Sequence, residues 1–135
     1  MQSQTKILVV DDDPDIRDAV STILEAHSYQ VVTANNGEEG LKKLKEERPD
    51  LMILDLLMPK LDGFGVLKEI QDPRWAKYCK IPILILTSIK EDVSRRRYEL
   101  ETGLDLNIDD YVEKPINPGI LMERVKKLLD KRIQS

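Results

Sequence analysis

Hydrophobic runs and amphipathic segments alternate along this chain of 135 residues. The first run, Ile7 to Val10, is wholly apolar and mostly β-branched, which is typical of a strand buried on both faces. Between such runs, the apolar residues recur at helical spacing. The pattern predicts strands at 6–10, 30–34, 51–54, 82–86 and 111–112, and helices at 14–27, 38–48, 65–70 or slightly beyond, 91–102 and 117–131. One predicted helix therefore follows each predicted strand.

This strict alternation predicts an α/β fold, in which a parallel sheet carries helices on both faces and right-handed crossovers join the strands. The runs at 6–10, 51–54 and 82–86 are continuously apolar, so we place them at the centre. The strands at 30–34 and 111–112 are shorter or more polar, which favours the edges. The expected fold is a doubly wound, five-stranded sheet of order 2-1-3-4-5, the flavodoxin-like (βα)5 arrangement, with residues 1–135 forming one domain.

Composition narrows the class of protein. Apolar residues make up 41% of the chain and only six residues are aromatic, so we expect one aliphatic core. The net charge of −4 is poorly suited to general nucleic-acid binding, which needs clustered Lys and Arg. A lone cysteine, Cys79, makes no disulfide framework, and no run has the length of a membrane span. We expect a soluble cytoplasmic domain without direct contact to nucleic acid or membrane.

Polar residues that carry chemistry follow four of the predicted strands. Ligands of an open α/β sheet bind beyond the carboxyl ends of its strands, at the point where the strand order reverses. We therefore expect the following side chains to converge at one edge of the sheet: Asp11 and Asp12 after the first strand, Asp55 after the third, Thr87 and Ser88 after the fourth, and Lys114 after the fifth.

Three converging carboxylates need positive charge. Two carboxylates about 4 Å apart repel by about 4 kcal/mol at an effective dielectric constant near 20. Lys114 supplies one charge, and oxygen ligands in a partly open site favour Mg²⁺ as the second cation. A carboxylate beside Mg²⁺, a lysine and a hydroxyl has the surroundings of a phosphoryl acceptor, because phosphoryl transfer depends mainly on positioning and charge neutralisation.

Four segments in the right order, "ILVVDDDPDIR", "LMILDLLMPKLDGFGVL", "ILILTS" and "YVEKPI", resemble the receiver domain of two-component response regulators, chemotaxis-type regulators included. The resemblance covers essentially the whole chain. It implies a phosphorylation-dependent signalling switch rather than an enzyme, although a receiver promotes its own phosphorylation and dephosphorylation. The implied phosphoryl donor is a sensor histidine kinase or a phosphotransfer protein; the downstream target is not identified by the sequence.

The resemblance also assigns roles to residues. Asp55 is the implied phosphoacceptor, and the implied Mg²⁺ ligands are Asp11, Asp12, Asp55 and the backbone carbonyl of Leu57. Thr87, Ser88 and Lys114 are implied to contact the phosphoryl group, with Tyr111 as the aromatic residue that turns inward during switching. Pro59 and Gly63 are implied to shape the loop after Asp55, and the Lys114–Pro115 bond to be cis. The face formed by the fourth helix, fifth strand and fifth helix is the implied output surface, and it allows a phosphorylation-dependent homodimer.

The chain departs from the family pattern in two ways. The spacing between Thr87 and Lys114 is longer than usual, with the surplus placed at 104–109. Leu57 and Ile89 are bulky and apolar at positions where many relatives carry polar residues. We expect these side chains to screen the phosphoryl group from water and to slow self-dephosphorylation.

Other functions stay open from the residues alone. An Mg²⁺-dependent phosphatase with an aspartate nucleophile would use Asp11 and Asp13, but the chain lacks room for a substrate-covering cap. A binding module that no longer takes phosphate is a further alternative, against which the complete set of polar residues argues. An EF-hand reading of the Asp11 to Asp15 run fails, because position six is Ile16 instead of Gly. Trp75 and Tyr78, in the long connection at 72–80, are expected to pack that connection onto the body.

Overall fold

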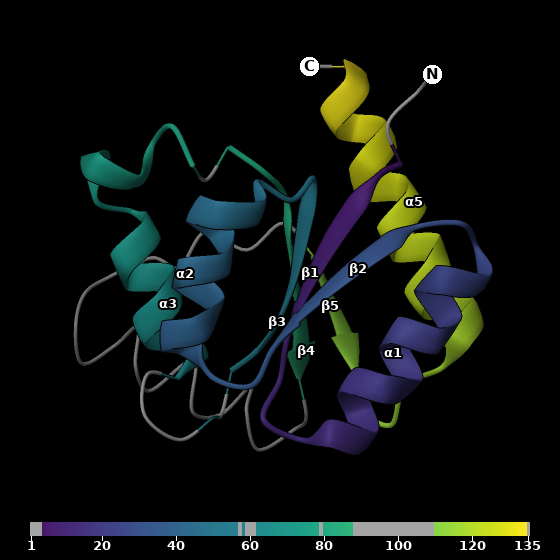
Figure 1. Ribbon diagram of the computed structural model, residues 1–135. Helices are drawn as coiled ribbons and strands as arrows, with labels where there is room; N and C mark the ends of the chain where they lie inside the picture. The colour runs from purple at the N-terminus through teal and green to yellow at the C-terminus, as the bar shows by residue number, and fades with distance from the viewer. Residues whose placement is uncertain (1–3, 57, 59–61, 79, 88–109, 135) are drawn as a thin grey trace.

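The computed structural model describes residues 4–56, 58, 62–78, 80–87 and 110–134 (Figure 1). Its elements are, in chain order, β1 (Lys6–Val10), α1 (Pro14–Ala26), β2 (Gln30–Ala34), α2 (Gly37–Glu47), β3 (Leu51–Asp55), α3 (Gly63–Ile70), the short 3-10 helix η1 (Pro73–Trp75), β4 (Ile83–Thr87), β5 (Asp110–Glu113) and α5 (Pro118–Gln134). The helix predicted at 91–102 lies outside the described residues. The other predicted strands and helices are present, with bounds that shift by a few residues, and η1 was not predicted.

The five strands form one parallel sheet of order β2-β1-β3-β4-β5, as predicted. β1 pairs with both β2 and β3, so that Val10 lies beside Ala34 on one side and Leu54 on the other. On the far side of β3, Asp55 pairs with Leu86 of β4, and Thr87 pairs with Glu113 of β5. The polar residues that follow the strands are therefore brought together at the carboxyl ends of the strands, at the bottom of the view in Figure 1.

Helices cover both faces of the sheet (Figure 1). Because successive strand residues point to opposite faces, β1 contributes Leu8 and Val10 to one core layer and Ile7 and Val9 to the other. The first layer packs under α2 and α3, and the second packs under α1 and α5. This two-sided burial is the reason that β1, β3 and β4 carry unbroken apolar runs.

Local capping sets the helix starts that matter for the site. The Asp13 side chain accepts a hydrogen bond from the backbone N–H of Asp15, and Pro14 occupies the first turn of α1. The Asp62 side chain accepts one from Gly65, which starts α3 two residues earlier than the sequence pattern predicts. Asn117 caps α5 by accepting from the N–H of Ile120, as expected. α1 ends one residue earlier than predicted, because His27 is its C-cap.

The long connection after α3 is packed onto the body. Trp75 is only 6% exposed and belongs to the core layer under α2 and α3, with Tyr78 packed against that layer. This confirms the packing role expected for the two aromatic residues. In the described part of the chain, no helix is both long enough and apolar enough to cross a membrane.

Candidate functional site

The carboxyl ends of β1 and β3 bring three carboxylates together. One oxygen from each of Asp11, Asp12 and Asp55 can be chosen so that all three lie within 4.8 Å of one another. Asp11 and Asp55 are buried, with exposed fractions of 0% and 1%, whereas Asp12 is exposed. Two inner carboxylates and one at the surface thus form a site that is open on one side.

Lys114 provides a positive charge within this group. Its ammonium nitrogen lies 3.2 Å from Oδ1 of Asp55 and 3.4 Å from Oδ2 of Asp11. The backbone holds the lysine there, because the N–H of Lys114 donates to the carbonyl of Thr87 at the end of β4. The peptide bond between Lys114 and Pro115 is cis, as the resemblance implied. Lys114 therefore contacts both Asp11 and Asp55, which are far from it in the sequence.

The site has three carboxylates and one lysine, so its charges favour an additional cation. Burial raises the pKa of Asp11 from 3.8 to about 6; the backbone N–H of Asp13 opposes this shift, the nearby Asp55 carboxylate adds to it, and Lys114 opposes it. Oδ1 of Asp11 accepts the N–H of Asp13 at 2.9 Å, whereas Oδ2 is buried, accepts no hydrogen bond in the described part of the chain, and has the Lys114 ammonium 3.4 Å away as an ion-pair partner. A buried carboxylate oxygen without a hydrogen bond, next to two further carboxylates, fits a hard divalent cation such as Mg²⁺.

Arg17 is a site residue that the sequence reasoning missed. Its guanidinium donates a 2.7 Å hydrogen bond to the backbone carbonyl of Asp11, while the N–H of Asp11 donates to the carbonyl of Ala34 in β2. These two hydrogen bonds hold the backbone of Asp11 in place, and with it the peptide that links Asp11 to Asp12. The only sequence signal was an arginine one turn into the helix that follows the acidic run.

Gly63 sits against the backbone of the Asp55 strand end. A Cβ at this position would overlap the carbonyl oxygen of Asp55 and come within 2.6 Å of Cα of Leu56. The N–H of Gly63 donates to the carbonyl of Leu56 at 2.9 Å, which ties the start of α3 to the end of β3. This close approach of the start of α3 to the end of β3 requires glycine at position 63.

The other residues expected in the site lie as follows. Thr87 is buried, 2% exposed, at the end of β4 on the same edge of the sheet. Leu57, Pro59 and Ser88 lie outside the described residues, as do Cys79 and Ile89. Thr87 therefore joins the site through its backbone carbonyl, which accepts the N–H of Lys114.

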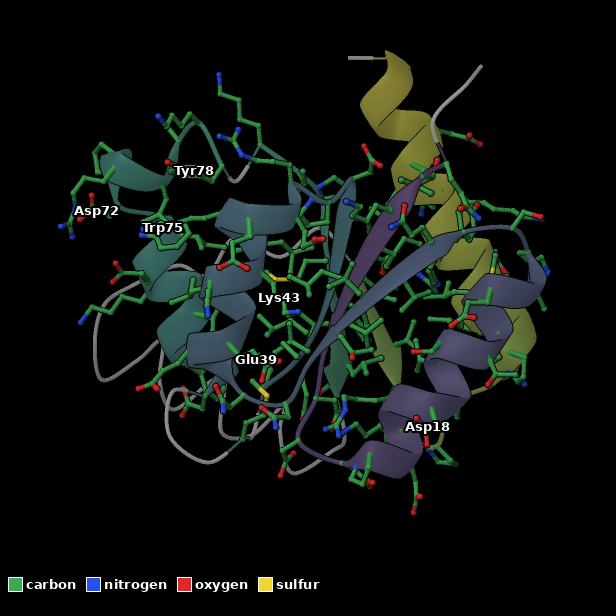
Figure 2. All side chains as sticks on the ribbon, viewed as in Figure 1. Asp18, Glu39, Lys43, Asp72, Trp75 and Tyr78 are labelled. Atoms are coloured by element: carbon green, nitrogen blue, oxygen red, sulfur yellow. The ribbon has the colours of Figure 1, made fainter. Side chains whose placement is uncertain are left out.

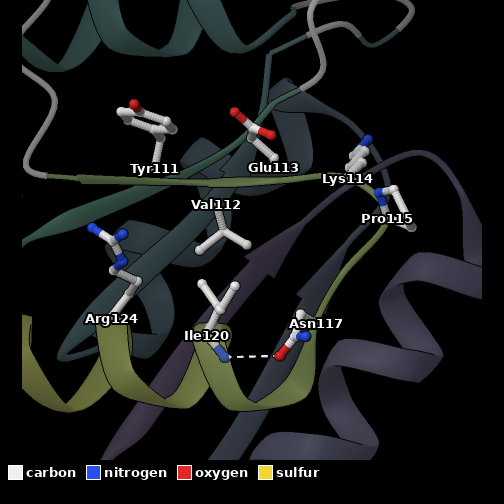
Figure 3. A pocket seen from close by; sticks show the side chains of 8 residues that line it. All are labelled: Tyr111, Val112, Glu113, Lys114, Pro115, Asn117, Ile120 and Arg124. Carbon is white, nitrogen blue, oxygen red and sulfur yellow. Dashed lines mark hydrogen bonds between the residues drawn. The ribbon is translucent and has the colours of Figure 1, made fainter.

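Tyr111 lies at an exposed position of β5. Its side chain is 49% exposed and lines an open pocket of about 340 Å³ between β5 and the start of α5. Figure 3 shows Val112 of β5 facing Ile120 of α5 on the opposite side of the strand from Tyr111 and Glu113. At the far end of this pocket, Arg124 contacts Asp110 at 3.1 Å. The surface of β5 and α5 is thus contiguous with Lys114, which connects it to the acidic site.

Comparison with known proteins agrees with the observed fold. The family model of the response regulator receiver domain matches residues 7–126, and the chain belongs to this family. It is 42% identical over 129 residues to the probable transcriptional regulator ycf27 of Guillardia theta, a match that covers 96% of this chain and 47% of that protein. It is also 42% identical to the alkaline phosphatase synthesis transcriptional regulatory protein PhoP of Bacillus subtilis, over 92% of this chain and 48% of that protein.

A solved structure, the chemotaxis protein CheY4 of Vibrio cholerae, matches with a TM-score of 0.78 and 29% identity, over 93% of this chain and 99% of that one. The flavodoxin-like fold and the receiver class are confirmed, and with them the role of the domain as a phosphorylation-dependent switch. The chain spans about half the length of the curated relatives named above.

Proposed function

We propose that Asp55 is the phosphoacceptor of this receiver domain and that the reaction depends on Mg²⁺. The proposal is supported by the position of Asp55, whose carboxylate is buried beside Asp11 and contacts the Lys114 ammonium at 3.2 Å. An oxygen of Asp55 attacks the phosphorus of a phosphohistidine, the P–N bond breaks, and the imidazole leaves with its electron pair. The donor is a sensor histidine kinase or a phosphotransfer protein.

The residues proposed to hold Mg²⁺ are Asp11, Asp12, Asp55 and the carbonyl of Leu57. When bound, the cation supplies positive charge to the oxygens of the transferred group. Lys114 is proposed to contact one phosphoryl oxygen, which stabilises charge that two neighbouring carboxylates would otherwise repel. Thr87 and Ser88 are proposed to contact the remaining oxygens, Thr87 from its buried position at the end of β4.

We propose that phosphorylation shifts the population between two arrangements of the β5 and α5 surface. Thr87 moves toward the phosphoryl group, and Tyr111 turns inward from the half-exposed position that it occupies here. The pocket between β5 and α5 then changes shape. This surface is proposed to contact a downstream protein or a second copy of the chain, and we propose no contact of this domain with nucleic acid.

Two further parts of the proposal rest on the length and composition of the chain. Residues 1–135 are proposed to form a single receiver domain, and that domain is proposed to act in the cytoplasm. The alternative of an aspartate-nucleophile phosphatase receives no support from the matched family, whose named relatives are regulators.

The labelled residue distinguishes the receiver from the phosphatase. The protein is incubated with acetyl phosphate in the presence or absence of Mg²⁺, and phosphorylated peptides are mapped by mass spectrometry after reduction of the acyl phosphate. We expect Mg²⁺-dependent labelling of Asp55, its loss in Asp55→Asn, and its retention in Asp18→Asn, a control at an exposed carboxylate of α1. Labelling of Asp11 in place of Asp55 would establish the phosphatase chemistry and refute the proposal.

A further inference from the structure

Three cations lie within 5.8 Å of the centroid of the Tyr78 ring, at the end of the sheet opposite to the acidic site, and one of them, Lys45, lies still closer to the neighbouring Trp75 ring, at 4.5 Å. Lys45 and Arg48 lie at the C-terminal end of α2, and Lys77 follows η1. From the centroid of the Tyr78 ring, Nζ of Lys45 is 5.8 Å away, the guanidinium carbon of Arg48 4.6 Å, and Nζ of Lys77 5.2 Å. All three cationic side chains are exposed. We call Lys45, Arg48, Lys77 and Tyr78 the basic cluster.

The basic cluster lies where the strands begin. The last residue of α2, Glu47, accepts a hydrogen bond through its carbonyl from Nζ of Lys6, the first residue of β1. Figure 2 shows Tyr78 and Trp75 near the upper end of the sheet, at the end of the connection that follows α3. The acidic site lies beyond the other ends of the same strands. The two charged groups therefore occupy opposite edges of the molecule.

The aromatic ring is held by the core. Trp75 and Tyr78 meet edge to face, with 5.9 Å between their centroids, and the buried Trp75 indole donates to Glu69 of α3 at 3.0 Å. Arg48 adds a hydrogen bond to the carbonyl of Lys77, at 3.4 Å, which links α2 to the connection. The basic cluster is thus a built arrangement of two chain segments around a fixed ring, and its cations are not scattered surface charges.

The carboxylates near the basic cluster are engaged elsewhere. Glu46 pairs with Lys42, Glu47 with Lys6, and Asp72 with Arg74, at 3.9, 3.7 and 3.0 Å respectively. In the described ranges, no carboxylate lies within 4.0 Å of the cations of the basic cluster. The ring quadrupole attracts the cations but carries no net charge, so their mutual repulsion is not neutralised.

Helix electrostatics explain only part of this arrangement. Cations at the C-terminal end of a helix interact favourably with its dipole, which accounts for Lys45 and Arg48 on α2. Lys77 comes from a different element and brings a third positive charge to the same ring. This convergence indicates an anionic ligand that lies across α2 and the segment after η1.

Two classes of polyanion fit the surroundings poorly. A membrane surface favours apolar side chains beside the cations, but the large exposed hydrophobic residues among the described ones are Tyr111 and Ile120, on the β5 and α5 surface. Single-stranded nucleic acid needs open aromatic faces for base stacking; here Trp75 is buried and cations cover Tyr78. A long polyanion would also meet a chain whose net charge is −4.

We propose that the basic cluster is a docking surface for a short acidic segment of a partner protein. Such a segment places its carboxylates against two or three cations of the basic cluster. Repulsion from the other acidic residues of the receiver domain is screened by salt beyond about one Debye length, roughly 8–10 Å. This proposal goes beyond the phosphorylation switch and uses none of its residues. Its success or failure is therefore separate from that of the phosphoryl chemistry at Asp55.

Titration with a peptide of alternating glutamate and serine residues, followed by amide NMR, tests the proposal. We expect chemical-shift changes confined to Lys45, Arg48, Lys77, Tyr78 and their neighbours. The variant Arg48→Gln/Lys77→Gln should weaken binding by roughly threefold to tenfold, the value of two exposed ion pairs. A second variant, Lys45→Gln/Lys77→Gln, leaves Arg48 at its left-handed backbone position, where φ is 48°. It should weaken binding over the same range.

The matched control is Lys126→Gln/Lys127→Gln, which removes two charges from exposed positions of α5. We expect this variant to bind the peptide within about twofold of the wild-type protein, since it lowers only the long-range field. An equal loss in the control, or shifts centred elsewhere on the surface, would overturn the proposal. Tighter binding of a single-stranded RNA or of anionic vesicles through the basic cluster would likewise overturn it in favour of that ligand.

Discussion

The ammonium of Lys114 lies 3.2 Å from a carboxylate oxygen of Asp55, although 59 positions separate the two residues in the chain. The same nitrogen is 3.4 Å from Asp11, so one lysine after β5 is shared by carboxylates at the ends of β1 and β3. This contact links a charge that follows the edge strand β5 to two charges at the ends of the central strands β1 and β3.

Replacing Lys114 with methionine should slow phosphorylation while preserving the fold. The substitution keeps much of the aliphatic stem but removes a charge-assisted hydrogen bond, for which about 1.5–3 kcal/mol is typical. This corresponds to a decrease of roughly 10- to 100-fold in the rate of labelling by acetyl phosphate. Mass spectrometry at short incubation times measures the rate. Lys126→Met, at an exposed position of α5, should label at the wild-type rate; equal rates in the two variants would show that Lys114 has no such role.

The stability of the metal-free protein should depend on the protonation of Asp11. Burial is the largest cause that raises the pKa of Asp11 to about 6 from 3.8. The folded state therefore favours the protonated acid, and this stabilisation is fully present below about pH 4 and lost as the pH rises through about 6. The loss in the free energy of unfolding is at most about 3 kcal/mol.

Urea unfolding between pH 4 and pH 7 measures this effect as the difference between the wild-type protein and Asp11→Asn, a residue that does not titrate. The advantage of the asparagine variant should grow as the pH rises. Saturating Mg²⁺ should reverse the trend in the wild-type protein, because the cation favours the ionised carboxylate. A difference that does not change with pH would show that Asp11 does not titrate in this range.

Arg17→Met should weaken Mg²⁺ binding through the backbone of Asp11. The guanidinium donates at 2.7 Å to the backbone carbonyl of Asp11 and not to its carboxylate. Residues that orient metal ligands typically contribute 10- to 100-fold in affinity, and we expect about tenfold here. Isothermal titration with Mg²⁺ measures the change. Arg74→Met, whose guanidinium pairs with Asp72 at the far edge, serves as the control with unchanged affinity.

Gly63→Ala should destabilise the protein and displace the end of β3. The added Cβ would overlap the Asp55 carbonyl and lie 2.6 Å from Cα of Leu56, so the backbone must shift. We expect a loss of about 1–3 kcal/mol in the free energy of unfolding, measured by urea denaturation, together with slower labelling of Asp55. Gly119→Ala, whose Cβ would meet only the Asn117 side chain at 3.3 Å, should change stability by less than about 1 kcal/mol.

Leu57→Asn should shorten the lifetime of the phosphorylated state. This expectation comes from the sequence, since Leu57 and Ile89 are apolar where many relatives of this family carry polar residues. A polar side chain two positions after Asp55 in the sequence is expected to admit or orient water for hydrolysis of the acyl phosphate. The decay of labelled protein, followed after removal of acetyl phosphate, measures the lifetime. A wild-type lifetime of seconds that Leu57→Asn leaves unaltered would contradict the expected screening.

The sequence by itself determined the layered fold. The unbroken apolar runs of β1, β3 and β4 predicted central strands, because only strands covered on both faces bury every side chain. The order β2-β1-β3-β4-β5 followed from that burial and from the handedness of crossovers. Asp11, Asp12, Asp55 and Lys114 were predicted to converge, since parallel strands end at one edge of the sheet.

Only the tertiary structure decided how these residues meet. The bridging position of Lys114, the Arg17 contact to the Asp11 carbonyl, and the lack of space at Gly63 are relations between segments that the linear pattern does not encode. The same holds for Lys45, Arg48 and Lys77, which read as ordinary surface charges until packing of Trp75 and Tyr78 gathers them around one ring. Periodicity reports which face a residue occupies, whereas distances between faces depend on how the whole chain packs.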